Sequence, residues 1–177
     1  MSRILAFAGS NSSTSINYKL VKYTAALLQE HSVEMLDAAT MAIPMFSEDI
    51  EKAEGYPQII KKLKETISGV DALVISVNEH NSSLSSFFKN VIDWLSRIDR
   101  NFLADKKIFL LSSSPGKRGG MSARDTANNI LPRFGAEIVA TFSLPSFYDN
   151  FAEDSGILEA ELKEKHQTAV RQFLAKI

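Results

Sequence analysis

Residues 3–17 read RILAFAGSNSSTSIN, in which an apolar run passes through a small polar loop directly into a helical pattern. Ile4 to Ala8 are all apolar, which is typical of a strand buried on both faces. The same alternation recurs along the chain and predicts strands at Arg3–Ala8, Val33–Asp37, Ala72–Val77, Lys107–Ser112 and Ala136–Phe142. The helices predicted between and after these strands are Ile16–Glu30, Tyr56–Ser68, Leu84–Ile98, Ala123–Phe134 and Gly156–Lys176.

Alternation of strands and helices predicts parallel strands joined by right-handed crossovers, with helices on both faces of one sheet. The first, third and fourth strands are almost wholly apolar and are expected at the centre, whereas Glu34 and Glu137 place the other two at the edges. These constraints predict a single domain over residues 1–177, a flavodoxin-like three-layer α/β sandwich with a five-stranded parallel sheet of order 2-1-3-4-5. Ligands of such sheets bind beyond the carboxyl ends of the strands, at the switch point between the first and third strands.

The composition excludes several classes of function. A formal net charge of −1 and the lack of any block of like charges give no electrostatic case for nucleic acid or an anionic membrane. The absence of Cys excludes disulfides and thiolate chemistry, and the three His residues show no metal-ligand spacing. The N-terminus does not read as a signal peptide, and no apolar run approaches the roughly 20 residues of a membrane span, so we expect a cytoplasmic protein.

The loop Gly9–Asn17 combines a series of hydroxyl side chains with the free N–H groups of a helix start, where the helix dipole favours an anion. We expect this loop to bind a phosphate through Ser10, Ser12, Ser15, Ile16 and Asn17. Another interpretation is that Thr14 or Ser15 only caps the helix. The loop contains neither a GxGxxG dinucleotide fingerprint nor a Walker Gly-Lys-Ser/Thr sequence.

Three loops together resemble those of the NADPH-dependent FMN reductases, a flavodoxin-like family. The first loop is similar to the family pattern Gly-Ser-x-Arg-x-x-Ser-x-Asn, with Ser12 in place of the Arg. Residues 79–97 resemble the family stretch that begins Glu-Tyr-Asn-x-Ser and ends Leu-Lys-Asn-x-Ile-Asp-Trp-Leu-Ser-Arg. Asn78 stands in place of the Pro that precedes this stretch in the family, and His80 replaces the Tyr within it. The sequence SSSPGKRGG at Ser112–Gly120 resembles the family's Ser-Pro-Gly-x-x-Gly-Gly loop.

The resemblance implies that the chain binds FMN, takes a hydride from NADPH or NADH, and passes electrons to free flavin, a quinone or another small acceptor. The cofactor then performs the electron chemistry, so no side chain is expected to act as a catalytic base or nucleophile, and no metal is expected. The second and third loops are implied to contact the flavin ring. Their implied contact residues are Asn78, Glu79, His80, Asn81, Ser82, Ser114, Pro115, Gly116, Gly119 and Gly120.

The resemblance also implies a homodimer or homotetramer, with the helix Leu84–Ile98 and the segment Ile43–Asp49 close to the neighbouring subunit. Trp94 in that helix is either ordinary core or a subunit contact, and His80 is either a flavin contact or an exposed turn residue. Lys117 and Arg118 either attract the phosphates of NADPH or form a solvated loop tip.

Two other functions stay open. One is a flavodoxin-type electron carrier, although such carriers commonly have strongly acidic faces and this chain has a net charge of −1. The other is a degenerate binding module, because Ser12, Asn78 and His80 depart from the family pattern. A hydrogen bond to a charged group contributes about 1.5–3 kcal/mol, so the missing Arg is expected to weaken phosphate binding about 10-fold to 100-fold. Leu144–Ser155 has no interpretation from the sequence.

Overall fold

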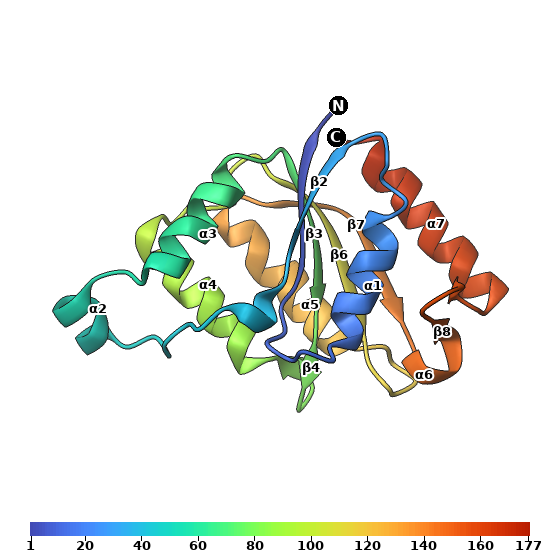
Figure 1. Cartoon of the computed structure of the whole chain (residues 1–177), viewed down its shortest axis with the longest axis horizontal. Helices are drawn as coiled ribbons and strands as arrows, with labels where there is room; N and C mark the ends of the chain where they lie inside the picture. Colours follow the sequence, from blue (N-terminus) through green and yellow to red (C-terminus); the bar gives the residue numbers. More distant parts are fainter.

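A five-stranded parallel sheet runs through the centre of the computed structural model, which describes all of residues 1–177 (Figure 1). Its strands are β1 (Arg3–Ala8), β2 (Ser32–Leu36), β3 (Ala72–Val77), β6 (Lys107–Ser113) and β7 (Glu137–Leu144). They lie side by side in the order β2-β1-β3-β6-β7. This confirms the predicted order 2-1-3-4-5, because the strands numbered in between, β4 (Glu79–His80) and β5 (Ser83–Leu84), form a separate hairpin.

Helices cover both faces of the sheet. The helices α1 (Ile16–Ala25) and α7 (Ala160–Leu174) lie on one face (Figure 1). The opposite face carries α3 (Gln58–Ser68), α4 (Ser86–Ile98) and α5 (Met121–Ile130). The short helix α2 (Glu48–Glu54) extends away from this face and has no buried residue. None of the helices has the length and apolar composition required to span a lipid bilayer.

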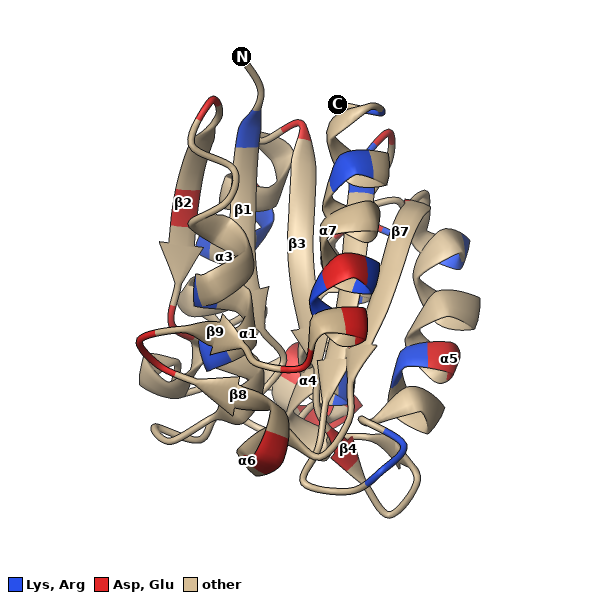
Figure 2. Cartoon of the chain, turned by 90° about the vertical axis from the view of Figure 1, so that its right-hand side faces the viewer, with Lys and Arg blue, Asp and Glu red and all other residues tan.

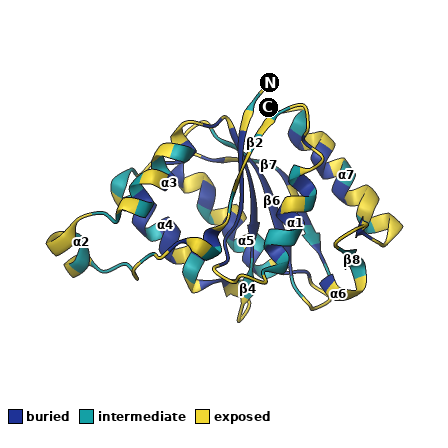
Figure 3. Cartoon of the chain, in the orientation of Figure 1, coloured by how far each residue is buried: buried dark blue, intermediate teal, exposed yellow.

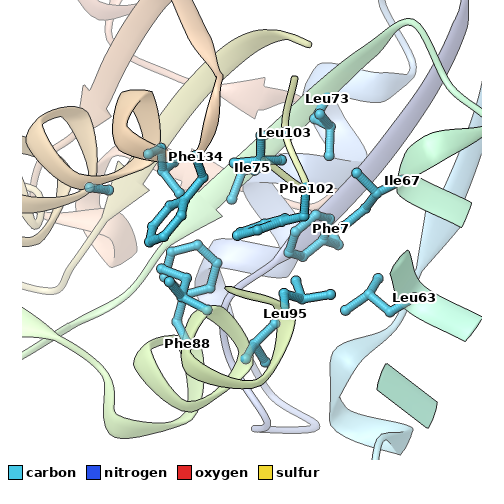
Figure 4. Close-up of a cluster of buried hydrophobic side chains, with 14 of the residues drawn as sticks. Phe7, Leu63, Ile67, Leu73, Ile75, Phe88, Leu95, Phe102, Leu103 and Phe134 are labelled. Carbon is cyan, nitrogen blue, oxygen red and sulfur yellow. The ribbon is translucent and has the colours of Figure 1, made fainter. Parts of the chain in front are cut away.

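The core divides into two clusters because successive side chains of a strand point to opposite faces. Leu5 and Phe7 of β1 pack towards α3, α4 and α5, whereas Ile4 and Ala6 pack towards α1 and α7. Figure 4 shows the first cluster, where the rings of Phe102 and Phe134 lie 5.1 Å apart, centroid to centroid. Burial of one such side chain contributes about 1.5–3 kcal/mol.

The central strands are buried almost throughout, whereas β2 has no buried residue and β7 is buried only at Ala140, Phe142 and Leu144 (Figure 3). Glu34 in β2 and Glu137 in β7 are both exposed. Charged side chains on edge strands oppose pairing with the strands of other molecules. The position of the two glutamates therefore explains why these strands, and not the others, lie at the edges.

Seven helix boundaries differ from the prediction, and local turns or hairpins explain four of these differences. The first helix ends at Ala25 rather than Glu30, because the N–H groups of Leu27 and Leu28 bond to carbonyls three residues back. These tight turns place Leu28 in the core, with 1% of its surface exposed. The helix α5 stops at Ile130, and the chain continues to Phe134 as a 3-10 turn containing Pro132.

The other two boundaries move because residues predicted as helical belong to small hairpins. Leu84 is part of β5, so α4 begins at Ser86, and Ser85 caps it by accepting a bond from the N–H of Phe88. Similarly, Gly156 belongs to β9 (Gly156–Ile157), which pairs with β8 (Phe151–Ala152). The segment Leu144–Ser155, which has no interpretation from the sequence, therefore contains the helix α6 (Phe147–Asn150) and the first strand and the turn of this hairpin. A 3-10 turn, Ala38–Thr40, was also not predicted.

Candidate functional site

Three loops follow the carboxyl ends of the neighbouring strands β1, β3 and β6. They lie together at the carboxyl end of the sheet (Figure 1). The first loop joins β1 to α1 through Gly9–Ser15, the second joins β3 to α4 through residues 78–85, and the third joins β6 to α5 through residues 114–120. The three predicted contact segments are therefore brought together by the sheet order. The edge that they form is the one at which ligands of such sheets bind.

Asn17 holds the first loop to the other two. Its side chain is buried, and its Oδ1 accepts bonds from the hydroxyl of Ser76 (2.7 Å) and the N–H of Ser113 (2.9 Å). Its Nδ2 donates to the carbonyl of Ser113 at 3.1 Å. The side chain of Asn17 thus fixes the ends of β3 and β6 against α1. The side-chain amide of Asn17 therefore has a structural role within the chain.

The first loop has several backbone donors without a partner in the chain. The N–H groups of Ser10, Asn11, Ser13, Ile16 and Asn17 make no hydrogen bond within the protein. The side chain of Ser15 accepts from the N–H of Tyr18, so this hydroxyl caps α1. Because the donors surround a helix N-terminus, they form an anion-binding arrangement.

The remaining hydroxyls of this loop shape it. Ser10 is 7% exposed, and its Oγ accepts from the N–H of Ser12 at 3.3 Å. Ser12 is exposed, and its Oγ lies 3.2 Å from the hydroxyl of Thr14. Gly9 lies against the ring of Phe88, where an added Cβ would come within 2.6 Å of a ring carbon. The close approach of α4 therefore requires glycine at the start of the loop.

The second loop is a two-residue hairpin. Asn81 (φ 51°) and Ser82 (φ 59°) both have left-handed backbones, as a type I′ turn requires. Their N–H groups have no partner in the chain. His80 is exposed and lies 3.3 Å from the amide of Asn78, from His80 Nε2 to Asn78 Nδ2. The Oδ1 of Asn78 is buried and has no hydrogen-bond donor.

Glu79 joins the second loop to the third. Its Oε2 accepts a bond from the N–H of Ala123 at 3.2 Å, in the first turn of α5. Gly120, at the start of that helix, has no side chain to cap it. The carboxylate therefore stabilises the helix N-terminus, both as a hydrogen-bond acceptor and as a negative charge at the positive end of the helix dipole.

The third loop is closely packed against the chain beyond β7. Gly119 has φ +59°, and an added Cβ would come within 2.8 Å of the backbone of Leu144. The N–H of Ser146 bonds to the carbonyl of Gly116 at 2.9 Å, and that of Phe147 bonds to the carbonyl of Ser114 at 3.1 Å. The segment Leu144–Ser155 thus supports the third loop. Ser114 and Gly116 keep their own N–H groups free, and Pro115 is exposed between them.

The family-like residues of α4 hold the segment that carries α2. Asn90 accepts from the N–H of Phe46 (2.7 Å) and donates to the carbonyl of Pro44 (3.0 Å). Trp94 donates to the same carbonyl at 2.8 Å, and its side chain is fully buried within the single chain. Arg97 binds both carboxylate oxygens of Glu51 in α2. The core interpretation of Trp94 is therefore correct, because a fully buried side chain has no surface for a subunit contact.

The charges of the site are few. The three loops contain no ionisable side chains other than Glu79, His80, Lys117 and Arg118. No group of three or more His, Cys, Asp or Glu residues in the structure could hold a metal ion. The large cavities of the chain are lined by residues other than Ser10–Asn17 and Asn78–Ser82, so these two loops form an open edge rather than a closed pocket.

Comparisons with known proteins agree with this fold. A quinone reductase of Escherichia coli is 37% identical over 89 residues, which are 50% of this chain and 47% of that protein. An NAD(P)H-dependent FMN reductase of Pseudomonas aeruginosa is 31% identical over 123 residues, 69% of this chain and 65% of that protein. The matched stretches thus span less than two thirds of either relative.

Among solved structures, the flavoenzyme NAD(P)H:(acceptor) oxidoreductase FerB of Paracoccus denitrificans superposes with a TM-score of 0.76, at 22% identity and with 99% of both chains covered. An NADH:FMN oxidoreductase in its apo form gives the same TM-score at 17% identity, covering 100% of this chain and 90% of that one. At these identities the likeness concerns the fold. The family model of the NADPH-dependent FMN reductases matches residues 2–149, and the chain therefore belongs to that family.

Proposed function

We propose that this chain is an FMN-dependent NAD(P)H oxidoreductase that delivers electrons to free flavin, a quinone or another small acceptor. The observation that carries the proposal is the set of partnerless backbone N–H groups in three adjacent loops. Backbone donors in folded proteins are normally paired or solvated, so their concentration at a switch point favours a ligand rich in acceptor atoms. FMN is such a ligand, because its flavin ring and its phosphate both carry hydrogen-bond acceptors.

The phosphate fits the first loop. The N–H groups of Ser13, Ile16 and Asn17 are free there, beside the hydroxyls of Ser10 and Ser12. Charge-assisted bonds from such donors are about twice as strong as neutral ones. Ser15 contributes through the cap that starts α1, and Asn17 through the side chain that holds the loops together. No cation lies in this loop, so its backbone dipoles are expected to supply most of the attraction.

The flavin ring fits the second and third loops. The buried Oδ1 of Asn78 lacks a donor, and the pyrimidine part of a flavin ring carries an N–H group. Free backbone donors at Asn81, Ser82, Ser114 and Gly116 suit the acceptor atoms of the same ring. The proposed contacts also include Glu79, His80, Pro115, Gly119 and Gly120, which shape these loops.

When bound, FMN would supply the redox chemistry: it accepts a hydride from NADPH or NADH and passes electrons to the acceptor. The residues of this chain bind and orient the reactants, and we assign no side chain the role of a general base. Glu79 already accepts a bond from Ala123, which agrees with a positioning role. We also propose that the chain acts in the cytoplasm.

The proposal includes a homodimer or homotetramer. The open edge formed by the first two loops does not by itself exclude water from a flat ring, and hydride transfer benefits from a water-excluded site. The segment that carries α2 extends from the body of the molecule (Figure 1). Its Met45 has 64% of its surface exposed. A second copy covering these surfaces would complete the site.

Titration of the purified apoprotein with FMN tests the proposal. We expect quenching of flavin fluorescence and a raised melting temperature with FMN, and weaker effects with riboflavin, which has the same ring without the phosphate. Addition of NADPH or NADH with a quinone should then consume the nicotinamide. Binding of FMN without this consumption would identify an electron carrier instead. Lack of any response to saturating FMN would identify a degenerate module.

A further inference from the structure

The second loop contains a buried side-chain acceptor that has no partner. Asn78 directly follows the last residue of β3, and its Oδ1 is closed to solvent and lacks a hydrogen-bond donor. The only other buried side-chain polar atom without a partner is Nδ1 of His166, which lies among aromatic rings of the core. Figure 2 shows β4, which follows Asn78, beyond the carboxyl ends of the central strands. The unpaired oxygen is therefore at the edge where ligands of such sheets bind.

Asn78 also has an unused donor. Its backbone N–H bonds to no carbonyl and to no side chain of the protein. At this position the family pattern has Pro, which has neither an N–H group nor a polar side chain. Asn78 thus adds one donor and one acceptor, and the chain itself satisfies neither. Buried polar groups are rarely left in this state, because they lose their hydration without gaining a replacement bond.

His80 determines which end of the Asn78 amide is buried. The Nδ2 of Asn78 lies 3.3 Å from Nε2 of His80. Because an amide nitrogen can only donate, Nε2 accepts this bond, and the proton of the neutral imidazole is on Nδ1. The nitrogen of the Asn78 amide is thereby held at the exposed imidazole, which leaves Oδ1 on the buried side.

The hairpin that carries His80 is fixed at its base. Glu79 pairs with Leu84 across the hairpin, and its carboxylate accepts a bond from the N–H of Ala123 in α5. His80 and the turn that follows it are exposed. The residue that orients the Asn78 amide therefore lies at the open end of a hairpin whose other end is tied to a helix.

We infer that Asn78 recognises the edge of the flavin ring at which N3–H lies between two carbonyl groups. Its Oδ1 accepts from N3–H, and its backbone N–H donates to a neighbouring carbonyl of the ring. His80 is a positioning residue that acts through Asn78. The inference rests on the proposed function and adds a contact that Pro, the residue of the family pattern, does not supply. Because Oδ1 is closed to solvent in the free chain, the exposed end of the hairpin must move as the ring enters.

FMN methylated at N3 tests the contact, because this analogue keeps the phosphate and the ring but lacks the N–H group. Calorimetric titration of the apoprotein should show that FMN binds about 10-fold or more tightly than N3-methyl-FMN. Asn78→Ala, which removes Oδ1 and keeps the backbone N–H, should bind the two flavins about equally. Asn101→Ala, at an exposed loop position, is the matched control and should keep the preference.

Two variants of His80 test its positioning role. His80→Leu removes the acceptor of the bond from Nδ2, so the Asn78 amide is free to reverse and to present a donor to N3–H. We expect the preference for FMN over N3-methyl-FMN to fall at least about threefold. His80→Gln supplies a carbonyl oxygen that accepts from Nδ2 and should retain the preference. Loss of the preference in both variants, or in neither, would show that His80 does not orient the amide.

The outcomes separate this inference from the proposed function. Equal affinity of the original chain for FMN and N3-methyl-FMN would overturn the inference and leave the proposed function standing. A preference that persists in Asn78→Ala would also overturn it, because N3–H would then be recognised by another residue. Binding of neither flavin would overturn both.

Discussion

Asn17 and Ser113 form a reciprocal pair of hydrogen bonds between α1 and the end of β6. The N–H of Ser113 donates to Oδ1 of Asn17 at 2.9 Å, and Nδ2 of Asn17 donates to the carbonyl of Ser113 at 3.1 Å. The hydroxyl of Ser76, near the end of β3, donates to the same Oδ1 at 2.7 Å. One buried amide therefore sets the relative positions of all three loops, and its replacement should disturb stability and ligand binding together.

Asn17→Asp should destabilise the protein by about 1–3 kcal/mol, because it removes the donor to Ser113 and buries a charge. The carboxylate keeps the shape of the side chain and can still accept from Ser76 and Ser113. Urea denaturation measures the loss. Asn101→Asp, at an exposed loop position, is the control and should change stability by less than about 0.5 kcal/mol. An equally stable Asn17→Asp variant would contradict the assigned role.

Ser12→Arg should tighten FMN binding about 10-fold to 100-fold, because it supplies the cation that the first loop lacks. Ser12 is exposed, so the longer side chain needs no space in the core. Fluorescence titration with FMN measures the gain, and riboflavin should bind the variant and the original chain equally. Ser12→Gln, which is long but neutral, controls for side-chain size. A similar gain with riboflavin would show that the phosphate is not the group contacted.

Gly119→Ala should cost clearly more stability than Gly55→Ala, although both glycines have positive φ. A positive φ costs a non-glycine residue about 1–3 kcal/mol in either position, and at Gly55 the φ of 73° and ψ of −157° form a conformation that other residues rarely adopt. At Gly119 the new Cβ would also come within 2.8 Å of the Leu144 backbone, whereas at Gly55 nothing lies within 4 Å. Thermal melting of the two variants measures the difference. Equal melting temperatures would mean that the third loop is not packed against Leu144.

His166 is a buried base that the proposed chemistry does not use. Its Nε2 lies 2.9 Å from the hydroxyl of Thr24, which itself donates to the carbonyl of Leu20. Nε2 therefore carries the proton, while Nδ1 is buried without a partner. Rings of Phe142 and Tyr23 lie 5.0 Å and 5.3 Å away, centroid to centroid. Desolvation by these surroundings lowers the pKa of His166 to about 4 from its ordinary 6.5.

Stability should consequently fall as the pH is lowered from 6.5 towards 4. In this range the unfolded chain binds a proton at His166 and the folded chain does not, so acid favours unfolding, and the loss levels off below pH 4. The shift corresponds to about 3 kcal/mol across the range. Urea denaturation at several pH values should show this slope reduced in His166→Leu and retained in His31→Gln. An unchanged slope in His166→Leu would contradict the assignment.

Periodicity and composition predicted the strand order because the central strands must be apolar on both faces. They could not predict where helices yield to tight turns or hairpins, since Leu28, Leu84 and Gly156 obtain their positions from tertiary contacts. The site segments were predicted for the same topological reason. The structural roles of Glu79 and Asn90 were not predicted. Glu79 bonds to Ala123 and Asn90 bonds to Phe46, and each pair is separated by 44 residues in the sequence.

The amino-acid sequence by itself determined the parallel sheet and the three loops at its carboxyl edge, because alternating apolar strands and helices allow few other arrangements. Only the tertiary structure decided which polar groups in those loops are free. Asn17 and Ser15 have the residue types of ligand contacts, but their side chains are engaged in holding strands, helices and loops in place. The physical reason is that a hydrogen-bonding group used within the fold is no longer available to a ligand, and that use depends on distances no sequence pattern records.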